Sequence, residues 1–241
     1  VLQGVAIFLT ILIFVWNSRG QGTAERKALT AFLSMTLILN VGYLFELMAD
    51  NGSAAFMGLQ LAHGGLIFMG YFICLFFCCY ANGYTPGWVS VYVFIYDVIM
   101  LVLVWTSRWH ELIFRNSRYE TLADGTGMLR VERGELYAFL VLGCELLPMV
   151  VALATVISYI RRECVAYRRK QIVMMTVILY LSYGMAILFS CRILPFHYNF
   201  AGILCMLLAD AFVVCFHGKG GFNLAAVSGD AMFANMRGGI I

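Results

Sequence analysis

The chain has 241 residues, of which 62% are hydrophobic and 12% are charged, and its mean hydropathy is +0.86. A soluble domain carries roughly a quarter of charged residues, so this composition excludes a water-soluble fold. The net charge of +3 is too small to favour nucleic acid as a partner. The apolar stretches lack the period-two alternation of outer-membrane barrels, so helices remain as the way to cross a bilayer. The sequence predicts an all-α integral membrane protein surrounded by membrane lipid.

Seven segments come close to the roughly twenty apolar residues that a membrane-spanning helix needs. They cover residues 1–16, 28–49, 56–80, 88–107, 135–160, 172–191 and 200–217. We therefore expect residues 1–217 to form a seven-transmembrane helix bundle and residues 218–241 to form a linker helix that leads to an output module absent from this sequence. The chain opens without Met inside an apolar run, so we expect it to be part of a longer protein.

The connections between these segments predict the orientation, because lysine and arginine concentrate in cytoplasmic loops. The densest basic cluster, at 161–170, follows the fifth segment, which places the N-terminus outside and the C-terminus in the cytoplasm of a multi-pass bacterial plasma-membrane protein. The outer loop 108–134 holds two β-prone stretches around a Gly-containing turn at 124–127, which predicts a short β-hairpin. The sequence leaves two alternatives for this loop: a lid over the outer end of the bundle, or a mobile loop without such a role.

Ionisable side chains inside apolar segments are costly in lipid and are therefore candidates for function. The candidate ligand-binding residues are His63, Asp97, Glu145 and Asp210 within the segments, and Arg192 and His197 beside the outer turn before the last one. Facing inward, they would line a polar pocket open to the outside. The alternative is that they pair with each other or with tyrosines and only fix the order of the helices. Pro148 is expected to kink the fifth helix near Glu145.

Motifs for catalysis or cofactor binding are absent from the sequence, which contains no His-Glu-x-x-His pair, no Gly-x-Ser-x-Gly turn and no P-loop. The eight cysteines lie mostly in apolar runs, where cysteine behaves as a small hydrophobe. Cys74 and Cys78 share a helix face, but no His or carboxylate is spaced with them as a further metal ligand. We expect no enzyme activity in this region, and neither a cofactor nor a metal.

Five stretches are similar to a known family: LFELMAD at 44–50, WHELIF at 109–114, GELY at 134–137, YRRKQ at 167–171 and AVSGDAMFANMRGGII at 226–241. Together they resemble the N-terminal seven-transmembrane sensor region of bacterial membrane histidine kinases. The resemblance implies an input domain followed by a PAS, kinase or diguanylate cyclase module, and His110 matches a histidine common at that place. The Gly-rich joint at 218–221 departs from the family pattern, which weakens the case for rigid output by the last helix.

These observations favour a receptor over an enzyme. We expect a ligand-sensing input domain of a signal-transduction receptor that binds an unknown small molecule from outside and acts, within a homodimer, on a cytoplasmic kinase or cyclase module. A small-solute transporter is the first alternative, although we find no convincing internal repeat of the transporter kind. A structural subunit of a larger membrane complex is the second.

Overall fold

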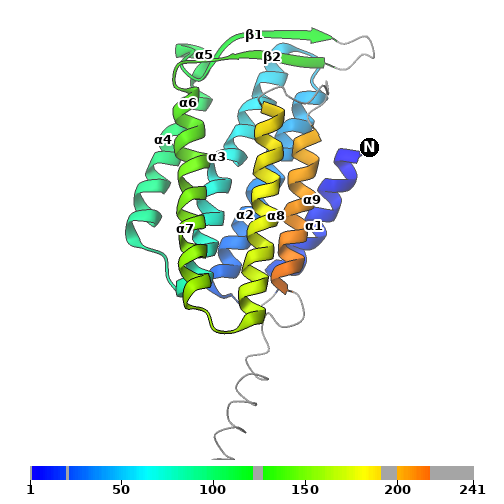
Figure 1. The fold of residues 1–241 in the computed structure, drawn as a ribbon. Coiled ribbons are helices and arrows are strands. Elements are labelled where there is room, and N and C mark those ends of the chain that lie inside the picture. The colour runs from blue at the N-terminus through cyan, green and yellow to red at the C-terminus, as the bar shows by residue number, and fades with distance from the viewer. Residues whose placement is uncertain (1, 20–21, 122–126, 191–199, 218–241) are drawn as a thin grey trace, which may run out of the picture.

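The protein is described by a computed structural model that covers residues 2–19, 22–121, 127–190 and 200–217. Long helices run side by side in a bundle, and a two-stranded hairpin lies across one end of it (Figure 1). A helix covers each of the seven apolar segments. The elements are α1 (Leu2–Ser18), α2 (Ala24–Leu47), α3 (Gly52–Asn82), η1 (Val89–Val93), α4 (Phe94–Trp105), α5 (Ser107–His110), β1 (Phe114–Thr121), β2 (Gly127–Arg133), α6 (Tyr137–Leu140), η2 (Val141–Leu146), α7 (Leu147–Arg162), α8 (Ala166–Ser190) and α9 (Phe200–His217).

The outer surface of the bundle is suited to lipid. Within the described residues, three helices are long and apolar enough to cross a membrane, namely Ala24–Leu47, Gly52–Asn82 and Tyr137–Arg162, and shorter apolar helices cover Leu2–Ser18, Val89–Trp105 and Gly202–His217. Large apolar side chains such as Phe8, Ile99 and Val150 are exposed along these helices. Soluble proteins rarely expose apolar patches of this extent, so the structure supports a membrane environment.

Small residues hold α2 and α3 together at the centre of the bundle. A Cβ atom added at Gly42 would lie 2.3 Å from the backbone nitrogen of Ala62, and one at Gly58 would lie 2.5 Å from that of Glu46. Gly65 makes an equally close approach to α2. Helices in lipid gain little from burying apolar surface, so close backbone packing across small residues is a main source of their association. The α2–α3 pair therefore has the most extensive helix–helix contact among the described residues.

The loop between α4 and α6 forms the antiparallel hairpin β1–β2, with a register shift between Arg115 and Arg118. β1 begins at Phe114 and β2 ends at Arg133, so the two strands take up much of the outer loop 108–134. Phe114 and Leu129 are buried against the helices, and the hydroxyl of Tyr119 donates a hydrogen bond to the carbonyl of Ala49 at the end of α2. The hairpin is thus packed onto the bundle end across which it lies in Figure 1.

The fifth helical segment is irregular where α6, η2 and α7 meet. Pro148 lies in the first turn of α7, directly after the π-helical turn η2, and has no N–H to offer the carbonyl of Cys144. Gly70 of α3 approaches this carbonyl so closely that a Cβ at residue 70 would lie 2.2 Å from its oxygen. The structure thus has a π-helical turn directly before the helix that contains Pro148, where the sequence predicts a kink, and a glycine of α3 fits against this turn. Such turns occur frequently at functional sites.

Candidate functional site

Asp97 is the least exposed of the predicted site residues that the structure describes. It lies in the first turn of α4 and is 0% exposed. The thiol of Cys144 lies beside its carboxyl group, but among the described residues neither carboxyl oxygen has a hydrogen-bond partner with acceptable geometry. Nearly all buried polar groups in proteins have a partner, so a group without one calls for a water, an ion or a ligand.

Tyr183 of α8 brings a second unsatisfied group to the same region. Its hydroxyl is buried and has no hydrogen-bond partner among the described residues. It lies within electrostatic range of Asp97 and of Glu145, which is part of η2. Polar groups from α4, η2 and α8 therefore come together inside the bundle. We call Asp97, Glu145 and Tyr183 the acidic cluster.

His63 of α3 borders the acidic cluster on the side of the hairpin. Its Nδ1 lies 2.9 Å from the carbonyl oxygen of Leu59, and because a carbonyl only accepts, Nδ1 carries a proton. In the neutral ring, Nε2 is then an acceptor. The ring packs edge-on against Phe114 of the hairpin, with centroids 4.8 Å apart, and against Tyr137, which is within electrostatic range of Glu145.

The position of Glu145 depends on how η2 packs against α4. Gly143 has no side chain, and the ring of Tyr96 occupies the space that a Cβ would need, only 2.1 Å from its ideal position. The Tyr96 hydroxyl donates a 2.8 Å hydrogen bond to the carbonyl of Phe139, which a regular α-helix pairs with the N–H of residue 143. A side chain from the neighbouring helix thus supports the wide turn that presents Glu145.

Asp210 lies in a different interface, between α9 and α1. Thr10 donates a 3.0 Å hydrogen bond to one of its carboxyl oxygens, and the other oxygen has no partner among the described residues. About two turns away in either direction, at Gln3 and Asn17, the same face of α1 makes further polar contacts. Gln3 donates to Asn40 of α2 at 2.8 Å, and Asn17 accepts from Nε2 of His217 at 2.8 Å.

The polar face of α1 consists of Gln3, Thr10 and Asn17, all buried and spaced seven residues apart. On α9, Asp210 and His217 are also seven residues apart, so the pairs Thr10–Asp210 and Asn17–His217 join two parallel helices in matching register. Our sequence reasoning missed this face, although three polar residues at period seven in an apolar helix were a visible signal. It also missed Tyr137, Tyr183 and Cys144, for which the sequence offers no signal.

The described residues include no group of three or more His, Cys, Asp or Glu side chains close enough together to hold a metal ion. The acidic cluster instead suits a ligand that donates hydrogen bonds to carboxyl and hydroxyl oxygens. The structure thus brings His63, Asp97 and Glu145 into one region and places Asp210 against α1. Arg192 and His197 lie outside the described residues.

A comparison with curated proteins gives no match. The model of one protein family, described as the N-terminal 7TM region of histidine kinase, matches residues 1–225. This match takes in the helical bundle, the hairpin, the acidic cluster and the polar face of α1. The chain therefore belongs to the family of N-terminal seven-transmembrane regions of histidine kinases, the membrane sensor part of these signal-transduction proteins.

Proposed function

We propose that this sensor region binds a small polar molecule at the acidic cluster and transmits binding through α9 to a cytoplasmic kinase or cyclase module, within a homodimer. The observation on which this proposal rests is the fully buried carboxyl group of Asp97, which has no hydrogen-bond partner among the described residues. Leaving such a group without a hydrogen-bond partner costs about 1–3 kcal/mol or more. A ligand that donates a hydrogen bond to the carboxyl group removes this cost, and the recovered free energy adds to the affinity of the ligand.

The hairpin fits the role of a lid in this proposal. Its residue Phe114 contacts His63, which borders the acidic cluster, and Arg133 lies over the ring of Tyr137 at 5.0 Å. A ligand arriving from the hairpin end would have to displace or pass these side chains. Opening of the hairpin would therefore expose the site, and its closure would exclude water from it.

We also propose that seven helices cross the membrane, with the hairpin end outside. The four tryptophans support the span, because Trp16 and Trp88 lie at helix ends toward one face, and Trp105 and Trp109 lie toward the other. Trp residues favour the membrane–water interface. With a rise of about 1.5 Å per residue, Trp88 and Trp105 are about 26 Å apart along the helix, close to the roughly 30 Å hydrocarbon thickness.

The native Cys164 provides a test of the orientation. It is exposed in the connection between α7 and α8, next to the basic residues at 161–170. A membrane-impermeant maleimide should label it only after spheroplasts are permeabilised, whereas a cysteine placed at Ser117 in the hairpin should be labelled in intact spheroplasts. The variant Cys164→Ala identifies the native signal. Labelling of Cys164 in intact spheroplasts would reverse the proposed orientation.

Ligand binding is tested by the thermal stability of the purified chain in detergent with a panel of amines, amino acids, nucleosides and sugars. A ligand of the acidic cluster should raise the melting temperature of the wild-type chain and have at least tenfold weaker effect on Asp97→Asn and Glu145→Gln. Asp210→Asn is the matched control, because Asp210 lies in the other interface. A compound that stabilises all four proteins equally would show that the site is elsewhere, and its flux into liposomes would favour a transporter.

A further inference from the structure

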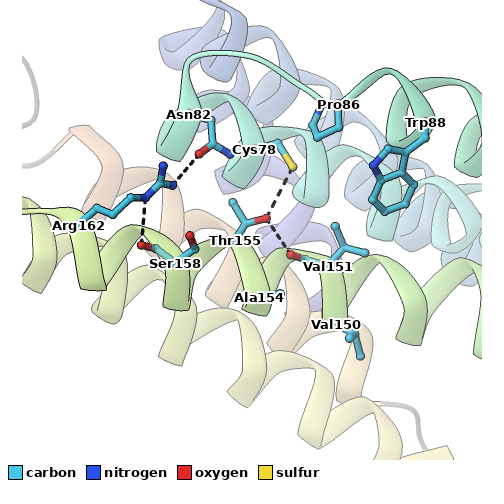
Figure 2. A pocket seen from close by; sticks show the side chains of 10 residues that line it. All are labelled: Cys78, Asn82, Pro86, Trp88, Val150, Val151, Ala154, Thr155, Ser158 and Arg162. Atoms are coloured by element: carbon cyan, nitrogen blue, oxygen red, sulfur yellow. Dashed lines mark hydrogen bonds between the residues drawn. The ribbon is translucent and has the colours of Figure 1, made fainter.

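A groove opens between the end of α3, the turn that precedes η1 and the face of α7 from Val150 to Arg162, and its polar end lies at the end of the bundle opposite the hairpin. It has a volume of about 370 Å³, at the lower end of the range of roughly 300–1,000 Å³ for ligand pockets. One wall is formed by Pro86 and Trp88, and Val150 and Ala154 lie across from it on α7 (Figure 2). Trp88 and Val150 are 51% and 62% exposed, so the groove opens sideways to where lipid chains would lie.

The other end of the groove is polar. Arg162 reaches from α7 to the last residue of α3, where its Nη2 donates a 2.9 Å hydrogen bond to Oδ1 of Asn82, and its Nε donates to the carbonyl of Ser158 (Figure 2). A guanidinium group has five N–H donors, and among the described residues Nη1 has no hydrogen-bond partner. The Asn82 amide N–H groups likewise have no acceptor within the part of the chain that the structure describes, and the Ser158 hydroxyl lines the same end.

The charge around this polar end is positive. Among the described residues, neither Arg161 nor Arg162 forms an ion pair with a carboxylate, whereas Arg115 and Arg130 of the hairpin do. The acidic residue near them, Glu163, accepts hydrogen bonds from the Tyr159 hydroxyl and the Val165 N–H, so each of its carboxylate oxygens already has a donor other than Arg161 or Arg162. An anion at the groove would therefore meet a cation that lacks an acidic partner.

We propose that this groove is a binding site for one anionic phospholipid, whose acyl chain lies against Trp88, Val150 and Ala154 and whose phosphate accepts hydrogen bonds from Arg162 and Asn82. The groove combines an apolar part open to lipid with hydrogen-bond donors at the level of the headgroups. Basic pockets between transmembrane helices at the cytoplasmic side are known to recognise anionic headgroups in this way. The site is separate from the acidic cluster; it rests on the proposed orientation in the membrane and does not depend on ligand binding at the acidic cluster.

The fluorescence of Trp88 can be used to measure which lipid occupies the groove. We would replace the other three tryptophans with Phe and reconstitute the chain in vesicles of phosphatidylcholine containing a small fraction of brominated phosphatidylglycerol, which quenches nearby tryptophan. Quenching of Trp88 should indicate an enrichment of phosphatidylglycerol of about fivefold over the bulk fraction, the effect of one basic residue near an anionic lipid. A chain whose single tryptophan is Trp105, which is 48% exposed at the other membrane face, should show no enrichment.

Two variants assign the effect to the groove. Arg162→Gln should abolish the enrichment at Trp88, whereas Arg161→Gln, with the same change of charge at a residue that does not line the groove, should preserve most of it. Ala154→Phe, which fills the apolar part and retains both arginines, should also abolish it. Equal quenching at Trp88 and Trp105, or equal effects of the two arginine variants, would overturn the proposal. Loss of the enrichment on adding millimolar inorganic phosphate would also overturn it, because the site would then bind a free anion.

Discussion

Two adjacent glycines of α3 allow a direct test of the packing that frames the candidate site. Gly65 faces α2, and a Cβ atom there would lie 2.5 Å from the backbone nitrogen of Leu39 and 2.5 Å from the carbonyl oxygen of Met35. Gly64 points toward α4, where the nearest atom would be the terminal carbon of Leu101 at 3.5 Å. The same Gly→Ala change is therefore a steric clash at one position and an ordinary contact at the next.

The size of the effect follows from the rigidity of the atoms that a methyl group added at Gly65 would meet. A separation of 2.5 Å is about 0.9 Å short of the 3.4 Å at which ordinary contact begins, and both neighbours are backbone atoms that cannot rotate away. Overpacking of this kind costs about 1–3 kcal/mol. For a chain of this size each kcal/mol shifts the melting temperature by roughly 2–4 °C, so Gly65→Ala should lower it by on the order of 2–12 °C. Gly64→Ala should stay within about 0.5 kcal/mol of the wild type.

The assay is thermal unfolding in detergent, followed by the reaction of a fluorogenic maleimide with thiols that become exposed. Most cysteines of the described residues are buried or half-buried, so they report loss of helix packing, and the exposed Cys164 is first changed to Ser to lower the background. Circular dichroism before heating checks that the helix content is equal. If Gly65→Ala and Gly64→Ala unfolded at the same temperature, the close approach of α2 and α3 described here would be refuted.

Three further changes test individual hydrogen bonds with the same assay. Thr10→Val should destabilise the chain by about 1–3 kcal/mol because it removes the donor to the buried carboxyl of Asp210, and Thr10→Ser should restore most of the loss. Tyr96→Phe should cost about 1 kcal/mol, since it deletes the hydroxyl that donates to α6, and an unchanged melting temperature would contradict this role. The hydrogen bond from Tyr159 lowers the pKa of Glu163 below its usual value near 4.5, so its stabilising effect is present at neutral pH and is lost as the pH falls through the lowered pKa. Tyr159→Phe should therefore lower the melting temperature at pH 7, and the difference from the wild type should shrink below pH of about 4.5; a difference that grows in acid would contradict the prediction. For this variant unfolding is followed by circular dichroism, because maleimides react with the thiolate and acid suppresses it.

The helices could be predicted from the sequence because each apolar run is long and is separated from the next by polar or glycine residues. Their ends could not, because polar residues extend a helix beyond the apolar core of the membrane. The helix α8 begins at Ala166, six residues before the apolar run at 172, since Arg168, Arg169 and Lys170 are good helix formers. The π-helical turn η2 depends on Tyr96 of another helix, and no local pattern in residues 141–146 announces it.

The two carboxylates of the acidic cluster, Asp97 and Glu145, were predictable by type, since ionisable side chains stand out in apolar runs, whereas Tyr183 was not. Their grouping was not, because it depends on the rotation of each helix about its axis. Asp97 and Asp210 look alike in sequence, yet one is buried beside Cys144 and the other receives a hydrogen bond from Thr10. Only the packed helices show which of these residues share an interface.

The packing of α9 explains how a small change at the acidic cluster would reach the far end of the bundle. Tyr183 is adjacent to Ser182, whose hydroxyl donates a hydrogen bond to the thiol of Cys205 on α9. The register of α9 relative to α1 is set further along by Thr10–Asp210 and by the contact of Asn17 with His217. Because these two contacts are seven residues apart on both helices, a shift of α9 by one residue breaks both at once, and in lipid no water replaces the lost partners. Two such contacts would favour discrete positions of the helix over continuous sliding if α9 transmits the signal as proposed. A ligand that favours one position of Tyr183 would shift the balance between two positions of α9 only by the difference in its affinity for the two states.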